Sequence, residues 1–239
     1  MKEESVSVKQ GKKALFYLIV QYQTDKIEAE RTIQMGNGNR GNTMIIKNGL
    51  VFTPEGKFEK KDFYIEGEYV AKETTDNKEV EAEGCYVIPG LVDIHFHGCV
   101  RHDMCDGTEE SIQALADYEA ANGVLAICPA TMTIPEEELF QAMNAAREHK
   151  NGKGADLVGI NMEGPFVNKE KKGAQKEEDI KLADVELFHK LQEAAGGLIK
   201  LVDLAPETEG AMDFINQVKD EVHVSIAHTM ADYDTATAA

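Results

Sequence analysis

The sequence of 239 residues predicts an α/β protein in which strand–helix units follow a small β portion. Two observations support this prediction. After Pro89, short apolar segments alternate with amphipathic segments that have the period of helices. The apolar segments are hydrophobic on both faces, which is typical of strands in a covered parallel sheet. Five such units in series indicate either an incomplete (β/α)8 barrel of the TIM type or a doubly wound sheet.

Residues 1–43 differ in charge from the rest of the chain. They carry seven Lys or Arg and five Asp or Glu, a net charge of +2, so residues 44–239 carry 18 against 38, a net charge of −20. The segment ends in a Gly- and Asn-rich run, 36–42, that is typical of a flexible linker. We therefore expect residues 1–43 to be a disordered or non-native extension before a natural start at Met44, with a small N-terminal β-element as the alternative.

Residues 44–88 are predicted to form the small β portion. Turn signals at 53–56 and 66–68 separate short segments rich in β-branched and aromatic residues. These segments are 45–46, 50–52, 63–65 and 69–70. No chemical motif is visible in this portion of the sequence.

Residues 89–239 are predicted to be the first part of the barrel, truncated inside its fifth helix. The expected strands are 91–95, 124–128, 157–162, 199–204 and 222–227. Thr108 is expected to cap the first helix and Gly123 to end it, and Pro135 with three glutamates is expected to begin the second. Apolar residues line a third helix (Ile180, Val185, Phe188, Leu191) and a fourth (Met212, Ile215, Val218).

Composition narrows the classes of partner. A formal net charge of −18 argues against nucleic acid or an anionic membrane, because both require basic patches. The four cysteines form no CxxC pair, which favours a reduced, cytoplasmic setting. The longest apolar run, 14–20, is too short to span a bilayer.

Histidines and a carboxylate fall where the predicted strands end, which is where barrel enzymes place their active sites. His95 and His97 are two residues apart, so on a strand both side chains point the same way. Glu163 ends the third strand and His228 the fifth. The other candidates, His149, His189 and His223, fall in helices or at the start of a strand and are interpreted as structural or surface residues.

Three imidazoles and one carboxylate form the ligand set of a catalytic zinc or iron site. A metal ion there would lower the pKa of bound water to near neutrality. The alternative interpretations are two surface histidines, a carboxylate that caps the next loop or helix at Glu163, and a core histidine bonded to a backbone carbonyl at His228.

Six segments together resemble the N-acetylglucosamine-6-phosphate deacetylase family of the amidohydrolase superfamily. They are PGLVDIHFHG (89–98), CDGT (105–108), PATMTIP (129–135), NMEGPFVNKEKKGAQ (161–175), LAPE (204–207) and SIAHTMADYDTA (225–236). Other relatives in the superfamily use a carboxylated lysine at the end of the fourth strand. Lys200 lies too early in its strand for that role.

The resemblance implies hydrolysis of the acetamide of N-acetylglucosamine 6-phosphate, a (β/α)8 barrel with a small β-domain, and a homodimer. Glu163 and His228 match metal ligands of the family, and His95 and His97 match a second metal position present in some members. The implied cofactor is a divalent metal ion, zinc first, with iron, manganese or cobalt as alternatives. Gln175 stands where some relatives place a histidine that contacts the substrate, so Gln175 and its neighbour Ala174 are the expected substrate-binding residues.

The sequence departs from the family pattern near its end. The pattern requires a further metal histidine about one unit beyond His228 and a catalytic Asp at the end of the last strand. We expect both beyond residue 239, so no catalytic residue is assigned in this chain, and the fragment alone is expected to be inactive. Two alternatives remain: a non-catalytic remnant that binds sugar phosphate or a partner subunit, and another amidohydrolase.

Overall fold

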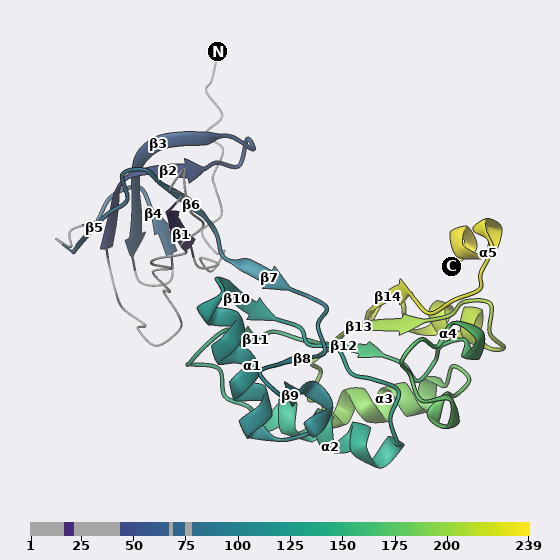
Figure 1. Ribbon diagram of the computed structural model, residues 1–239. Helices are drawn as coiled ribbons and strands as arrows, with labels where there is room; N and C mark the ends of the chain where they lie inside the picture. Colours follow the sequence, from purple (N-terminus) through teal and green to yellow (C-terminus); the bar gives the residue numbers. More distant parts are fainter. Residues whose placement is uncertain (1–16, 22–43, 67–68, 75–77) are drawn as a thin grey trace, which may run out of the picture. The chain divides into compact units, whose positions relative to one another are not determined.

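The computed structural model describes residues 17–21, 44–66, 69–74 and 78–239 (Figure 1). The chain forms two compact units, residues 1–90 and 91–239. Most of the extension expected at residues 1–43 lies outside the described residues. Its one described segment is strand β1 (Tyr17–Gln21), which pairs antiparallel with β6 (Cys85–Pro89).

The first unit is a mixed sheet with the strand order β1-β6-β2-β3-β4, in which β5 also pairs with β2. The additional strands are β2 (Met44–Phe52), β3 (Phe58–Glu66), β4 (Tyr69–Ala71) and β5 (Glu79–Glu81). Met44 and Ile46 of β2 are buried, and the pairing register then shifts so that Val51 is buried as well. Asn48, with a φ of 61°, lies within this bulge, which moves the buried face from even to odd positions.

The second unit is built on parallel strands, as the sequence predicts. Two three-stranded sheets, β11-β10-β7 and β12-β13-β14, are joined by a parallel bridge between Ala130 and Asn161. Their strands are β7 (Leu91–Asp93), β10 (Val124–Ile127), β11 (Asp156–Leu157), β12 (Ile160–Glu163), β13 (Ile199–Leu204) and β14 (His223–Ile226). Closure into a barrel remains a prediction.

Two of the strand predictions need correction. The first strand ends at Asp93, so His95 lies beyond it rather than within it. The third predicted strand is broken at residues 158–159 into β11 and β12. A Cβ added at Gly159 would lie 2.5 Å from the Lys200 side chain, so close contact with the next strand requires glycine at this break. A short hairpin of β8 (Gly98–Cys99) and β9 (His102–Asp103) was not expected.

Five helices follow strands of the second unit, and α1, α2 and α3 lie on one side of them (Figure 1). They are α1 (Glu109–Ala121), α2 (Glu136–Glu148), α3 (Val185–Ala194), α4 (Ala211–Val218) and α5 (Tyr233–Ala238). The Thr108 hydroxyl caps α1 by accepting a hydrogen bond from Ser111 N at 3.1 Å, as predicted. Ile180 lies before α3 rather than in it. None of the helices in the described part of the chain has the length and apolar character needed to cross a membrane.

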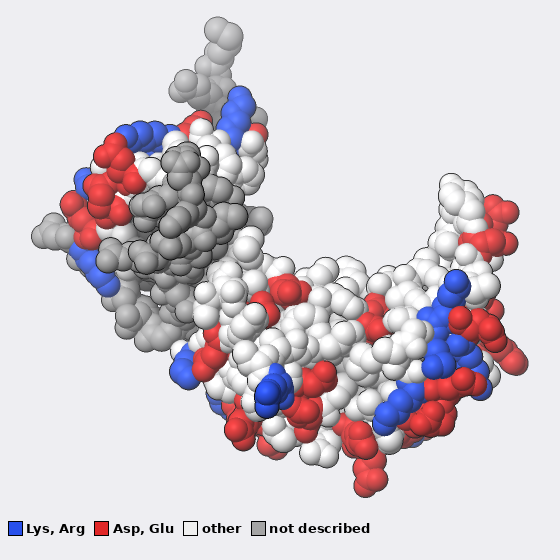
Figure 2. Space-filling model, viewed as in Figure 1, with Lys and Arg blue, Asp and Glu red and all other residues white. Residues whose placement is uncertain are grey.

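The charged residues of α2 follow the direction of that helix. Glu136, Glu137 and Glu138 form the first turn of α2 and Arg147 lies in its last turn, an arrangement that complements the helix dipole. On the face seen in Figure 2, acidic side chains are interspersed with basic ones over the helices of the second unit.

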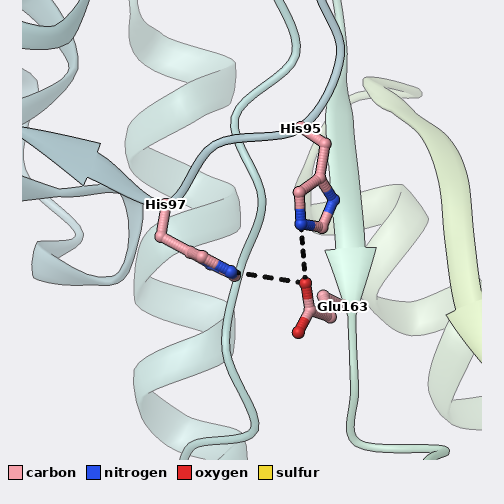
Figure 3. A group of neighbouring side chains, drawn as sticks. All are labelled: His95, His97 and Glu163. Carbon is pink, nitrogen blue, oxygen red and sulfur yellow. Dashed lines mark ion pairs between the residues drawn. The ribbon is translucent and has the colours of Figure 1, made fainter. Parts of the chain in front are cut away.

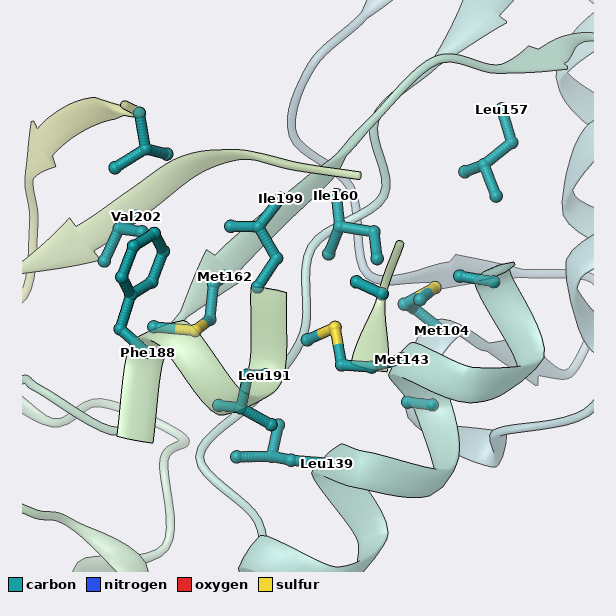
Figure 4. Packing of buried hydrophobic residues seen from close by; sticks show 14 of the residues in the cluster. Met104, Leu139, Met143, Leu157, Ile160, Met162, Phe188, Leu191, Ile199 and Val202 are labelled. Carbon is teal, nitrogen blue, oxygen red and sulfur yellow. The ribbon is translucent and has the colours of Figure 1, made fainter. Parts of the chain in front are cut away.

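The core of the second unit separates the two faces of its strands. Ile160 and Met162 of β12 pack with side chains of α2 and α3, including Met143 and Phe188, in one buried cluster (Figure 4). Because side chains alternate along a strand, Asn161 and Glu163 are directed to the opposite face. The apolar positions of β12 therefore place its two polar residues on the side away from the helices.

Candidate metal centre

Three of the predicted site residues meet at the carboxylate of a fourth, Glu163, whose side chain is only 4% exposed. His95 Nε2 lies 3.1 Å and His97 Nε2 3.3 Å from Glu163 Oε2, and both rings point toward it (Figure 3). His228 Nε2 lies 2.7 Å from the other oxygen, Oε1. The structure therefore brings all four predicted metal ligands together, although they come from three separate strand ends.

The backbone after β7 carries His95 and His97 into this position without being part of the strand. Cys128 N donates to Asp93 O at 2.8 Å, and Ala130 N donates to Phe96 O at 2.7 Å. These bonds hold the segment in an extended course along the neighbouring strand, so the two histidines still reach one carboxylate. Their rings lie 5.3 Å apart at 79° to one another.

His228 follows β14 in a left-handed conformation, with a φ of 47°. Its Nδ1 atom lies 2.8 Å from Lys171 O. A carbonyl oxygen only accepts hydrogen bonds, so Nδ1 carries a proton and donates to it. A metal ion at Nε2 would take the place of the proton through which Nε2 bonds to Glu163, while Nδ1 keeps its own proton. The bond to a backbone carbonyl anticipated for a core histidine is present, and it also directs Nε2 to Glu163.

Electrostatics keep the carboxylate ionised. Burial raises the pKa of Glu163, but hydrogen bonds from His97 and His228 more than offset this and lower it to about 2. The same hydrogen bond to Glu163 is the main reason that the pKa of His97 is raised. Without a metal ion, the site thus holds an anion beside one imidazole, that of His97, which tends to keep its proton.

The donor set fits a divalent cation. Ligand atoms of His95, His97 and Glu163 all lie within 4.8 Å of one another. Imidazole nitrogen and carboxylate oxygen are the ligands that Zn²⁺ takes in catalytic sites, and iron, manganese and cobalt accept the same set. A cation at this position would replace the protons that the imidazoles share with Glu163.

Gln175 is buried against Glu163. Its Nε2 donates to Glu163 Oε1 at 2.5 Å, and its Oε1 accepts from Thr133 N at 2.5 Å. The backbone N–H of Thr133 fixes the orientation of the amide, so the amide nitrogen must face the carboxylate. Gly164, with a φ of 72°, packs so closely that an added Cβ would overlap Thr133 Oγ1. Gln175 therefore holds Glu163, while the adjoining Ala174 is exposed.

Two buried polar residues near His95 were not predicted. Asn161 Nδ2 lies 2.9 Å from His95 Nδ1, and Asp203 Oδ2 lies 3.8 Å from the same atom. Asp203 is paired in register with Glu163, and its pKa is raised chiefly by burial. Strand alternation could have revealed both residues, because Asn161 and Asp203 interrupt otherwise apolar segments.

Glu207 connects the loops that follow β13 and β14. One of its oxygens accepts from Asn168 Nδ2 at 2.8 Å and from Met230 N at 2.6 Å, and the other accepts from the Thr229 hydroxyl at 2.5 Å. These bonds hold the loop that begins at His228. Lys200 lies at the far end of β13, where its ammonium group donates to Gly197 O at 2.7 Å.

A parallel α/β unit with histidines and a glutamate at the carboxyl ends of its strands has the arrangement in which α/β barrel enzymes place their active sites. No protein-family model matches the chain. The chain is 37% identical over 195 residues to the N-acetylglucosamine-6-phosphate deacetylase of Bacillus subtilis (strain 168), an alignment that covers 79% of the chain and 48% of the relative. It is 34% identical over 157 residues to the enzyme of the same name from Vibrio furnissii, covering 64% and 39%.

Solved structures agree on the fold. A deacetylase of the same name from Mycobacterium smegmatis, in complex with N-acetyl-D-glucosamine-6-phosphate, aligns with a TM-score of 0.73 at 24% identity, over 83% of this chain and 53% of that one. The comparisons confirm the resemblance to N-acetylglucosamine-6-phosphate deacetylases that the motifs indicate. The chain spans about half the length of the curated relatives it matches.

Proposed function

We propose that this chain supplies the metal-binding part of an N-acetylglucosamine-6-phosphate deacetylase. The proposed reaction is hydrolysis of the acetamide to glucosamine 6-phosphate and acetate. The observation that supports it best is the convergence of His95, His97 and His228 on the buried carboxylate of Glu163, in a chain 37% identical to an enzyme of that name. A cytoplasmic setting and a homodimer are proposed from the resemblance alone.

In this proposal Glu163 and His228 hold one metal ion, and His95 and His97 hold a second or share the first. A bound divalent ion supplies Lewis acidity and lowers the pKa of water. Glu163 remains an anion at working pH because its pKa is about 2. His228 would bind the ion through Nε2, because Nδ1 keeps its proton and donates to Lys171 O. Gln175 holds Glu163 in place because its Nε2 donates to Glu163 Oε1.

Proton transfer is assigned to the Asp that the resemblance places outside these residues. Such a group is typically worth about 10²–10⁴-fold in rate. We therefore propose metal binding for the 239-residue chain itself, and deacetylation for this metal site together with that Asp. The substrate class is a 6-phosphorylated N-acetylamino sugar. An N-acetylgalactosamine-6-phosphate deacetylase from Escherichia coli O157:H7, 28% identical over 201 residues, makes the galacto epimer the first competitor to test.

The first test is zinc content. The purified chain is loaded with zinc and dialysed, and bound metal is measured by elemental analysis. His228→Gln should lower the zinc content, whereas His189→Gln, the same change on an exposed histidine of α3, should leave it unchanged. Equal zinc content in the chain and in His228→Gln would contradict the metal site.

The second test is acetate release from N-acetylglucosamine 6-phosphate. The zinc-loaded chain is assayed alone and with the carboxy-terminal part of the Bacillus subtilis relative added in trans. Acetate release only in the mixture supports the proposal. Sugar-phosphate binding without acetate in either sample would favour the non-catalytic alternative, and preference for another amide would favour a different amidohydrolase.

A further inference from the structure

The second ring nitrogen of His95 faces two buried polar side chains whose role the proposed function leaves unexplained. While Nε2 faces Glu163, Nδ1 faces two side chains on the same side of the sheet, Asn161 and Asp203. Asn161 and Asp203 are each only 2% exposed. Among the described residues, Asn161 Oδ1 and Asp203 Oδ1 are buried and have no hydrogen-bond partner.

Metal binding determines which of these neighbours can bond to Nδ1. A histidine that binds a metal ion through Nε2 carries its proton on Nδ1 and needs an acceptor there. In the present orientation Asn161 offers Nδ2, which is a donor, at 2.9 Å. Two donors cannot bond to each other, so this contact fits only a ring whose proton is on Nε2. Asp203 Oδ2, at 3.8 Å, is the anionic acceptor near the same atom.

We propose that Asp203 is a positioning residue that accepts a hydrogen bond from His95 Nδ1–H and thereby directs Nε2 to the metal ion. This inference rests on the proposed function, because it presupposes a cation beside Glu163. A closure of about 1 Å turns the present ion-pair distance into a hydrogen bond. Asn161 then turns its amide or releases the ring.

The position of Asp203 in the sheet supports this role. It pairs in register with Glu163 on β12 and with Ser225 on β14, so its side chain lies on the face that carries the site. The adjacent residues Val202 and Leu204 are fully buried and are part of the apolar core. A hydrogen bond from Ser225 lowers the pKa of Asp203, but burial outweighs it, so the buried charge is only partly compensated. A hydrogen bond from the N–H of a metal-bound imidazole would compensate it further.

The first measurement needs no variant. In the zinc-loaded chain, long-range ¹H–¹⁵N NMR of the imidazole rings, assigned with His95→Gln, should show His95 protonated on Nδ1 and metal-bound through Nε2. A zinc-bound His95 without a proton on Nδ1 would overturn the inference.

The second measurement compares zinc affinity among variants by competition with a chromophoric chelator. Asp203→Asn keeps the shape of the side chain and should raise the Kd for zinc about 10–100-fold, as is typical for partners of metal ligands. Its metal-free melting temperature should stay the same or rise, because a buried charge is removed. A purely structural role would instead lower the melting temperature and leave the Kd unchanged. Asp213→Asn, the same change on an exposed residue of α4, is the control.

The outcomes separate this inference from the proposed function. If the unmodified chain binds no zinc, the proposed function is contradicted, because the chain then has no metal site. If the chain binds zinc and Asp203→Asn binds it equally well, only the role of Asp203 is wrong. Asn161 would be the acceptor instead if Asn161→Leu lost more zinc affinity than Asp203→Asn and His95 kept its Nδ1 proton in Asp203→Asn. Loss of a whole equivalent of zinc in Asp203→Asn would make Asp203 a ligand, which also contradicts the proposal.

Discussion

Replacement of Glu163 by glutamine removes the negative charge at the centre of the site while keeping the shape of the side chain. Glu163 is the group that His95, His97 and His228 all contact, at 2.7–3.3 Å. Changes in residues that only support a metal ligand typically reduce metal affinity about 10–100-fold, and loss of a ligand should exceed that range. We therefore expect Glu163→Gln to weaken zinc binding by more than about 100-fold, which corresponds to about 2.7 kcal/mol.

The same change should destabilise the metal-free fold. Glutamine resembles the protonated form of Glu163, and the pKa of Glu163 falls from 4.5 to about 2 in the folded chain. The difference of 2.5 pKa units corresponds to about 3 kcal/mol in favour of the charged form at neutral pH. Affinity must therefore be compared on folded protein, which circular dichroism before each titration can verify.

Weaker proton competition in Glu163→Gln would partly hide the expected loss of zinc affinity, so this effect must be minimised. Removal of Glu163 removes the main cause of the raised pKa of His97, so fewer protons compete with the metal ion. Titration at about pH 8 by isothermal calorimetry reduces this offset. Glu119→Gln is the matched control, because Glu119 is a buried glutamate of α1 whose pKa is raised by burial. A Kd for folded Glu163→Gln within about threefold of the unmodified chain would refute the reasoning.

Four further outcomes are expected. The metal-free chain should lose stability as the pH falls from about 4.5 toward 2, because the pKa of Glu163 is lowered on folding; urea unfolding should show a shallower acid slope in Glu163→Gln. Zinc affinity should increase as the pH rises through the raised pKa of His97, and titrations in buffers of different ionisation enthalpy should detect the released proton. Phe188→Ala should cost about 3–5 kcal/mol in denaturant unfolding, since the ring is fully buried against Phe214. Thr108→Ala should cost about 1 kcal/mol through loss of the cap on α1.

Much of the second unit could be predicted from local sequence, because local interactions define it. Thr108 and the first turn of α1 lie within four residues of each other, and strands that are apolar on both faces stand out against amphipathic helices. The break in the third strand could not be predicted in this way. It depends on the contact between Gly159 and Lys200, which is 41 positions away along the chain.

The site shows the same division between local and non-local information. Motifs identify His95, His97, Glu163 and His228, but the course of the backbone that carries the first two histidines depends on hydrogen bonds to residues 128 and 130. The orientation of Gln175 likewise depends on a backbone N–H 42 residues earlier. No local pattern in the sequence encodes either arrangement.

The packing of Gly164, Thr133 and Gln175 has a consequence for how this protein can vary among relatives. Thr133 occupies the space that a side chain at position 164 would need. Its backbone N–H also fixes the orientation of the Gln175 amide, which donates to Glu163. A larger residue at 164 displaces Thr133, and a histidine at 175 alters which atom meets that N–H. Substitutions at positions 133, 164 and 175 should therefore occur together in evolution, and an alignment of close homologues should show them as a covarying triplet.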